Sequence, residues 1–246
     1  MEFNLKFIGK EKVATDAWRL DFEKPKGYKH QAGQYNELHL KHAGVDDRGE
    51  TRWFTASSSP TEENLSITTR HVKDHPSTFK NALFDLKKGD SVPAKGPMGE
   101  FVLPPDKSVK LVWVAGGIGI TPFVSQMRYL LDTKDLHRDI ILFYGSRSDA
   151  DIVCPNLLNE VRDAMKHFKL VRVYSEEPPS FIDEHVETGL IDEKLINKYL
   201  PDLQDREFFV SGPEPMVDSF KQMLGFMGVR DNHIHQDWFP GYTERY

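Results

Sequence analysis

The chain has 246 residues, enough for two domains of ordinary size, and its 39% hydrophobic and 28% charged residues are typical of a protein with packed cores. This composition excludes a disordered or fibrous protein, and a formal net charge of −6 gives no basic surface for nucleic acid. The single cysteine, Cys154, excludes a disulfide within the chain and an iron–sulfur cluster held by this chain alone.

The sequence also predicts where the protein works. Its longest uncharged stretch, residues 111–127, is shorter than the ~20 residues that a membrane-spanning helix needs, and glycines and a proline interrupt it. The first residues carry neither an apolar signal core nor the arginine-rich pattern of a transit peptide. We therefore expect a cytoplasmic protein that does not insert into a membrane.

The first part of the chain, up to about residue 105, reads as short strands. Apolar and polar residues alternate with a period of two, and glycine, proline and polar turns separate the runs. Clear examples are Val13–Phe22, Tyr35–Leu40 and Leu65–Val72. About six such strands predict a closed or nearly closed antiparallel barrel of Greek-key type.

The pattern changes after Pro104 and Pro105. Compact apolar runs now alternate with helical segments, which predicts a parallel sheet in a doubly wound α/β domain. The runs are Leu111–Ala115, Ile140–Tyr144, Leu170–Tyr174 and Phe208–Ser211. We expect one domain over residues 1–105 and a second over 106–246, with Pro122 and Pro213 each in the first turn of a helix.

Two turns of the second domain predict a phosphate-bearing ligand. Gly116, Gly117 and Gly119 follow a buried strand and precede Thr121 and Pro122 at a helix start, where backbone N–H groups and the helix dipole favour an anion. The segment Ser211-Gly212-Pro213-Glu214-Pro215-Met216 repeats this arrangement at another strand end. Each turn alone could be a plain strand-to-helix connection, and neither is the G-x-G-x-x-G motif.

Three further segments complete a pattern that extends through most of the chain. They are Arg52-Trp53-Phe54-Thr55-Ala56-Ser57-Ser58, Lys95-Gly96-Pro97-Met98-Gly99-Glu100-Phe101 and Asp237-Trp238-Phe239-Pro240-Gly241-Tyr242. Together with the two glycine turns, they resemble the ferredoxin reductase superfamily, in which an FAD-binding barrel precedes an NAD(P)-binding α/β domain. Phe54 stands where that family has tyrosine. The segment Pro76-Ser77-Thr78-Phe79-Lys80 lies where the family begins a helix at the FAD phosphates, although the usual glycine is missing.

The resemblance implies roles for individual residues. Arg52 would pair with the FAD pyrophosphate, Phe54 would pack on the flavin, and Thr55 would hydrogen-bond near flavin N5. Thr55, Ser211, Asp237 and Phe239 would line the contact between flavin and nicotinamide, with Phe239 covering the flavin. The cofactor-binding residues would be Arg52, Trp53, Phe54, Thr55, Ser57, Ser58, Ser77, Thr78, Phe79, Gly116, Gly117, Gly119, Thr121, Pro122, Ser146, Arg147, Gly212, Pro213, Met216, Phe239 and Tyr242.

The chain is expected to prefer NADH, although NADPH use is possible. Relatives that use NADPH often carry Ser-Arg after the third strand of the sheet, whereas this chain has Ser175-Glu176-Glu177, and two carboxylates repel a 2'-phosphate. Arg147, after the second strand, argues in the opposite direction because it could hold a phosphate by itself.

The resemblance implies an NAD(P)H-dependent reductase that exchanges electrons through FAD with an external one-electron carrier, such as ferredoxin, flavodoxin or a haem or iron–sulfur protein. An NAD(P)H oxidase or free-flavin reductase is the first alternative, and a non-catalytic nucleotide-sensing module is the second. An arginine before an aromatic residue can also be a plain strand edge, and a terminal aromatic cluster can be a cap on the sheet. His233 and His235 would lie on one face of a short strand, but they have no third ligand nearby, so we assign no metal.

Overall fold

The computed structural model describes residues 1–72, 77–177 and 185–239 of the chain. The chain divides into two compact units, each described by itself below. Unit 1 comprises Met1–Leu103 together with Thr121–Tyr129, and unit 2 comprises Pro104–Ile120 and Leu130–Tyr246. The segment Thr121–Tyr129 therefore lies in unit 1, although the sequence pattern assigned it to the second domain. No helix within the described ranges is long and apolar enough to span a membrane.

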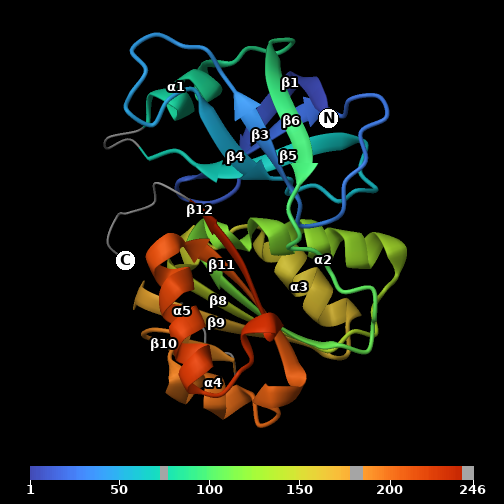
Figure 1. The fold of residues 1–246 in the computed structure, drawn as a ribbon, viewed down its shortest axis with the longest axis vertical. Coiled ribbons are helices and arrows are strands. Elements are labelled where there is room, and N and C mark those ends of the chain that lie inside the picture. Colours follow the sequence, from blue (N-terminus) through green and yellow to red (C-terminus); the bar gives the residue numbers. More distant parts are fainter. Residues whose placement is uncertain (73–76, 178–184, 240–246) are drawn as a thin grey trace. The chain divides into compact units, whose positions relative to one another are not determined.

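Unit 1 is built on a six-stranded antiparallel sheet in the order β4-β3-β6-β1-β2-β5 (Figure 1). The edge strands of this sheet are β4 and β5. An isolated bridge between Ala56, directly after β4, and Ile67 of β5 connects them, so the sheet is nearly closed. Its elements are β1 Glu2–Lys12, β2 Ala17–Glu23, β3 Tyr35–His39, β4 Thr51–Thr55, β5 Asn64–Arg70, α1 Thr78–Asp85 and β6 Ser91–Met98.

The core of unit 1 follows from the period of two along its strands. Leu20 and Phe22 of β2 are fully buried while Asp21 between them is not, because successive side chains point to opposite faces. Helix α1 adds Phe79 and Leu83, which lie on one face because they are four residues apart. The expected strand Val13–Phe22 begins later, at Ala17, since Val13 and Ala14 form a turn with hydrogen bonds to the Ala17 carbonyl.

Unit 2 contains a six-stranded parallel sheet in the order β10-β9-β8-β7-β11-β12. Its strands are β7 Lys110–Gly116, β8 Ile140–Ser148, β9 Phe168–Glu177, β10 Val186–Thr188, β11 Arg206–Pro213 and β12 Ile234–Phe239. Its helical elements are η1 Gly117–Ile120, α2 Thr121–Thr133, η2 Asp149–Asp151, α3 Pro155–Ala164, α4 Glu193–Tyr199, η3 Leu203–Asp205, α5 Glu214–Phe226 and η4 Asp231–His233, although the first part of α2 belongs to unit 1.

Both faces of the parallel sheet are buried. Val112 and Val114 of β7 pack with side chains of α4 and α5 on one face, where these two helices lie together (Figure 1). Trp113, between those valines, points to the opposite face and is fully buried as well. An antiparallel sheet followed by a parallel sheet with helices confirms the predicted fold class.

Two local expectations were wrong. His233 closes the short helix η4 and only His235 lies in strand β12, so the two histidines do not share a strand. Helix α5 begins at Glu214, and Pro213 still belongs to the end of β11. Pro215 is the proline of the first turn of α5, where a missing N–H costs nothing.

Candidate functional site

The two predicted phosphate turns lie at neighbouring strand ends in unit 2. Strand β7 ends at Gly116, and strand β11, which runs beside it in parallel, pairs Ser211 with Ala115. Gly212 follows directly, so both turns lie at the carboxyl edge of the sheet, which is where open α/β sheets bind ligands. The structure therefore brings together the two segments that the sequence pattern selected.

Contacts within the chain account for two of the glycines. A Cβ on Gly119 would lie 2.1 Å from the carbonyl oxygen of Ser211, and a Cβ on Gly116 would lie 2.2 Å from the sulfur of Met216. Gly119 thus packs against backbone too closely for any larger residue, whereas a larger residue at Gly116 would require the Met216 side chain to move. Gly117 differs, because it has a φ of +53° and no atom within 4 Å of a Cβ position.

Ser211 and Asp237 form a polar pair at the same edge. They stand opposite each other on β11 and β12, and the Ser211 hydroxyl donates a hydrogen bond of 3.4 Å to Asp237 Oδ2. Ser211 is fully buried. Burial raises the pKa of Asp237 to about 7, and the serine bond opposes this only in part. Asp237 can therefore hold or release a proton near neutral pH.

The aromatic residues at the end of β12 are described only in part. Phe239 pairs with Pro213 in the strand register, and Trp238 has 48% of its surface exposed. The side chain of Phe239 and the whole of Tyr242 lie outside the described residues. The predicted cover of the flavin by Phe239 stays a prediction.

Strand β4 of unit 1 carries the predicted flavin segment. Phe54 is buried and stacks on Phe79 with 6.0 Å between ring centroids, while the Arg52 guanidinium lies 5.2 Å from the same Phe79 ring. The Thr55 hydroxyl is buried and has no hydrogen-bond partner within the described parts of the chain. Trp53 points outward and is 45% exposed.

The serines after this strand have partners inside unit 1. The Ser57 hydroxyl lies 2.8 Å from the Thr68 hydroxyl, and the Ser58 hydroxyl accepts a hydrogen bond from the Ser66 N–H. The Ser58 carbonyl accepts one from Ser125 at 2.6 Å. These bonds hold the segment in place, and contact of Ser57 and Ser58 with a cofactor stays a prediction.

The polar side chains at the start of α1 already have hydrogen-bond partners within the chain, which the sequence did not indicate. The Ser77 hydroxyl caps the helix by accepting a hydrogen bond of 3.1 Å from the Lys80 N–H. The Thr78 hydroxyl contacts His42 Nε2 at 2.9 Å and accepts from the Asp46 N–H at 3.1 Å. His42 and Asp46 could not be found from the sequence, because nothing in the spacing of a polar loop shows which helix it will contact.

The segments predicted to select the coenzyme lie on neighbouring strands. Ser148 at the end of β8 pairs with Glu177 at the end of β9, and Glu176 is exposed beside it. Ser146 donates a hydrogen bond to the Ser148 carbonyl, and Arg147 forms a 3.3 Å ion pair with Asp151. The acidic pair therefore faces solvent at this edge, whereas Arg147 already has an acidic partner.

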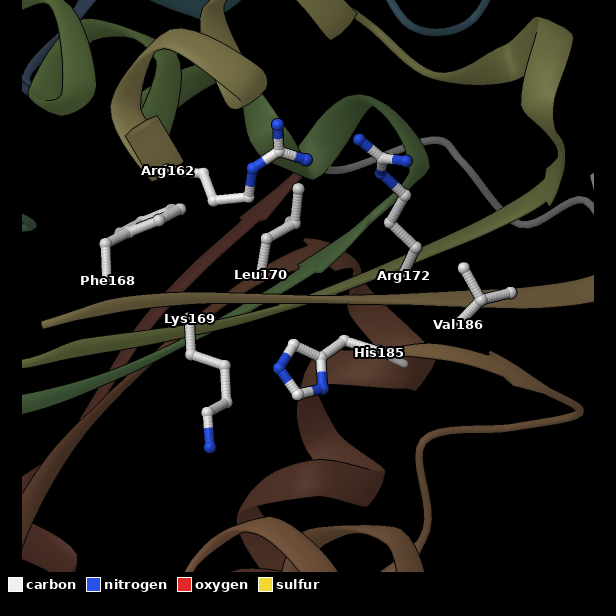
Figure 2. A pocket seen from close by; sticks show the side chains of 7 residues that line it. All are labelled: Arg162, Phe168, Lys169, Leu170, Arg172, His185 and Val186. Atoms are coloured by element: carbon white, nitrogen blue, oxygen red, sulfur yellow. The ribbon is translucent and has the colours of Figure 1, made fainter. Parts of the chain in front are cut away.

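A pocket of about 370 Å³ lies elsewhere in unit 2, at the beginning of β9 and hence at the opposite end of the strand from Glu177. Figure 2 shows Arg162 and Arg172 on one side of β9, and Lys169 and His185 on the other. The remaining lining residues are Phe168, Leu170 and Val186. Because this pocket is at the amino end of the strand, it is separate from the edge that carries the glycine turns.

Comparison with known proteins gives consistent matches. A family model described as an oxidoreductase NAD-binding domain matches residues 113–222. The reductase component of propane 2-monooxygenase from Rhodococcus jostii (strain RHA1) is 28% identical over 225 residues, covering 90% of this chain and 58% of that protein. Reductase component 2 of terephthalate 1,2-dioxygenase from Comamonas sp is 28% identical over 240 residues, covering 96% of this chain and 68% of that protein. The chain thus spans little more than half of the first relative.

Solved structures resemble the chain over nearly its whole length. The Amycolatopsis cytochrome P450 reductase GcoB is similar with a TM-score of 0.80 and 25% identity, covering 97% of this chain and 70% of that one. Ferredoxin-NADP+ reductase from Plasmodium falciparum is similar with a TM-score of 0.78 and 18% identity, covering 97% and 96%. The second likeness is one of fold alone.

Proposed function

We propose that this chain belongs to the ferredoxin reductase superfamily and is an NAD(P)H-dependent flavoprotein reductase. It takes electrons from a nicotinamide dinucleotide through FAD and passes them to an external one-electron carrier protein. The relatives described above are reductase components of oxygenase systems, which supports a partner of this kind. The partner itself would be a ferredoxin, a flavodoxin, or a haem or iron–sulfur protein.

One observation carries the proposal, namely the buried Thr55 hydroxyl on strand β4. A buried hydroxyl with no internal partner costs about 1 to 3 kcal/mol, so a ligand that supplies the missing acceptor or donor would remove this cost. Arg52 lies on the same strand and supplies the cation that a pyrophosphate needs. Strand β4 therefore fits the two polar ends of an FAD, the ring and the phosphates.

The carboxyl edge of unit 2 fits a dinucleotide. No atom lies within 4 Å of a Cβ position at Gly117, so the backbone there is open to close approach by a phosphate, and η1 leads from this turn into a helix. Glu176 and Glu177 favour NADH, because an exposed carboxylate pair repels a 2'-phosphate. We propose NADH as the preferred coenzyme.

A bound flavin supplies the redox chemistry, because it accepts two electrons from nicotinamide as hydride and can release them one at a time. The chain's residues position the reactants and exclude water. Thr55 offers a hydrogen bond at the flavin side, and Ser211 offers one at the nicotinamide side. Asp237, with a pKa near neutrality, holds or releases a proton through its contact with the Ser211 hydroxyl.

The test uses the purified full chain. Denaturation should release FAD, and anaerobic titration with NADH should bleach the flavin before candidate ferredoxins, flavodoxins and cytochromes are added in turn. Release of FMN alone would remove the roles of Ser77 and Thr78. Faster reduction of free flavin than of any carrier would instead support a flavin reductase, and a colourless protein that binds nucleotide would support a sensing module.

A further inference from the structure

A carboxylate of the chain lies at the start of α1. Asp46 belongs to the loop between β3 and β4, and its Oδ2 accepts a hydrogen bond of 3.1 Å from the Thr78 N–H. In return, the Asp46 N–H donates one of 3.1 Å to the Thr78 hydroxyl. Asp46 thus takes a backbone donor at the first residue of this helix, where a helix favours an anion.

Two arginines hold the same carboxylate. Arg48 Nη2 lies 2.8 Å from Asp46 Oδ2, and the Arg48 N–H donates to Oδ1 at 3.1 Å. Arg52 Nη2 lies 3.5 Å from Oδ1. The hydrogen bond from the Arg48 side chain, with further bonds from Thr78 and the Arg48 backbone, holds the pKa of Asp46 well below its usual range. The group is therefore an anion at every pH at which the enzyme would work.

Arg52 also binds the loop that carries Asp46. Its Nη1 donates hydrogen bonds to the carbonyl oxygens of Arg48 at 2.7 Å and Gly49 at 3.2 Å. Gly44 and Gly49 flank Asp46 with positive φ, which glycine adopts without strain, and neither has an atom within 4 Å of a Cβ position.

These donors are the ones that the proposed function assigns to the phosphates of FAD. A pyrophosphate would use the Arg52 guanidinium and the Thr78 N–H. The Asp46 carboxylate accepts the hydrogen bond of the Thr78 N–H and lies 3.5 Å from Arg52 Nη2 as its ion-pair partner. Two anions cannot share them, since like charges at hydrogen-bond distance repel strongly. Either the phosphate or the carboxylate occupies the place between Arg52 and the first residue of α1.

We propose that Asp46 is an internal competitor for the flavin pyrophosphate. The Asp46 carboxylate would have to leave the Thr78 N–H before an FAD phosphate could take that hydrogen bond. Displacement also frees Arg48 to follow the phosphate as an additional cation. This inference rests on the proposed function, because it assumes that Arg52 and Thr78 serve FAD.

The expected effect follows from competition. When only a fraction of the free protein has the phosphate place open, the apparent affinity for FAD falls by that same fraction. Asp46→Asn keeps the size of the side chain but removes its charge, so it should tighten FAD binding about 10-fold or more and speed up association. Riboflavin has no phosphate, so its affinity should stay within about 2-fold.

The experiment removes the flavin from wild-type protein and the variants, and then titrates each with FAD and with riboflavin by fluorescence quenching. Asp47→Asn is the matched control, because Asp47 is the neighbouring acid and is exposed. Asp47→Asn should leave the affinity for FAD within about 2-fold of the wild-type value. It therefore distinguishes an effect of the Asp46 contacts from an effect of the change in net charge alone. Asp46→Ala repeats the test if Asp46→Asn melts below the wild type.

Each result decides the question. The inference is supported if the Asp46 variants bind FAD more tightly, if their affinity for riboflavin is unchanged, and if Asp47→Asn does not change the affinity for FAD. Unchanged or weaker FAD binding overturns it and would make Asp46 a residue that only orders the loop. Equal effects of Asp46→Asn and Asp47→Asn also overturn it. If wild-type protein binds neither flavin, the proposed function itself fails, and this inference fails with it.

Discussion

Asp237 is the residue whose charge should depend most visibly on pH. Its folded pKa of about 7 lies above the ordinary value of 3.8 because of burial. The folded chain therefore binds more protons than the unfolded chain between about pH 4 and pH 7, and stability falls as pH rises through this window. Above pH 7 the half-buried carboxylate of Asp237 is charged, and the cost of removing that charge from water is fully present.

Asp237→Asn should remove this dependence. We expect the free energy of unfolding of the wild type to fall from pH 5 to pH 8 by more than that of the variant, with a difference on the order of a few kcal/mol, measured by denaturant titration at each pH. Asp218→Asn, an exposed acid on α5, is the control and should follow the wild type. Parallel pH curves for wild type and Asp237→Asn would show that the carboxyl group is not buried in a neutral form.

Arg52 should determine how firmly the flavin is held. A charge-assisted hydrogen bond to phosphate contributes about 1.5 to 3 kcal/mol, so Arg52→Ala should weaken FAD binding by one to two orders of magnitude. Equilibrium dialysis measures the affinity for FAD. Arg19→Ala, which makes the same substitution on strand β2, is the control. FAD affinity equal to that of the wild type would remove Arg52 from the site.

The coenzyme preference depends on Glu176 at the end of β9. We expect a higher kcat/KM for NADH than for NADPH, and Glu176→Gln should narrow the ratio a few-fold, since a surface charge contributes about 0.2 to 1 kcal/mol. Glu160→Gln, an exposed acid on α3, should leave the ratio unchanged. A clear NADPH preference of the wild type would contradict the argument and point to Arg147.

At the scale of elements, the packing of β11 against η1 leaves no room for a side chain at position 119. Gly119→Ala should destabilise the protein by about 1 to 3 kcal/mol, because the new Cβ would lie 2.1 Å from the Ser211 carbonyl oxygen. Gly225→Ala is the matched change, since nothing lies within 4 Å of its Cβ position in helix α5. That change should stabilise by up to ~1 kcal/mol, because alanine favours a helix.

Melting temperatures of the two alanine variants test this pair. Equal melting temperatures would mean that β11 can shift without cost. The outcome also bears on function, because the same displacement would move Ser211 relative to Asp237. A lower melting temperature with unaltered nicotinamide affinity would assign Gly119 to packing alone.

The sequence predicts best those strands whose burial in the folded protein leaves a clear apolar pattern. Leu111–Ala115 and Phe208–Ser211 are recognisable because a strand buried on both faces must be apolar throughout. Strand β10 is short and half exposed, so it carries no such pattern. The glycine turns could also be predicted, because each is a short contiguous segment. The Ser211–Asp237 pair follows from the register of two neighbouring strands. The contact of Asp46 with Thr78 joins residues 32 apart through two loops, and no periodicity encodes it.

At the scale of the whole chain, a cut at the change of pattern near residue 105 would divide unit 1. Phe123 packs on Phe101 with 5.5 Å between centroids, Ser125 donates to the Ser58 carbonyl, and Arg128 pairs with Glu62 at 3.1 Å. The first part of α2 therefore completes the core of unit 1, even though it follows a strand of unit 2.

A chain of residues 1–105 should consequently be unstable by itself. We expect it to melt well below unit 1 of the full protein, because it leaves the Ser58 carbonyl without its partner and uncovers Phe101. The control joins residues 1–103 through a flexible linker to residues 121–133 and should recover a cooperative transition by circular dichroism. Equal melting of both chains would mean that α2 contributes nothing to unit 1.

Helix α2 has a thermodynamic consequence for the protein as a whole. Its residues through Tyr129 belong to unit 1 and those from Leu130 onward to unit 2, so neither unit can unfold completely without disturbing a helix that the other needs. A nucleotide that binds unit 2 would then raise the melting temperature of unit 1 as well, by mass action. By the same reasoning, a flavin held in unit 1 would raise the melting temperature of unit 2, so a single helix would make the unfolding of the two units interdependent.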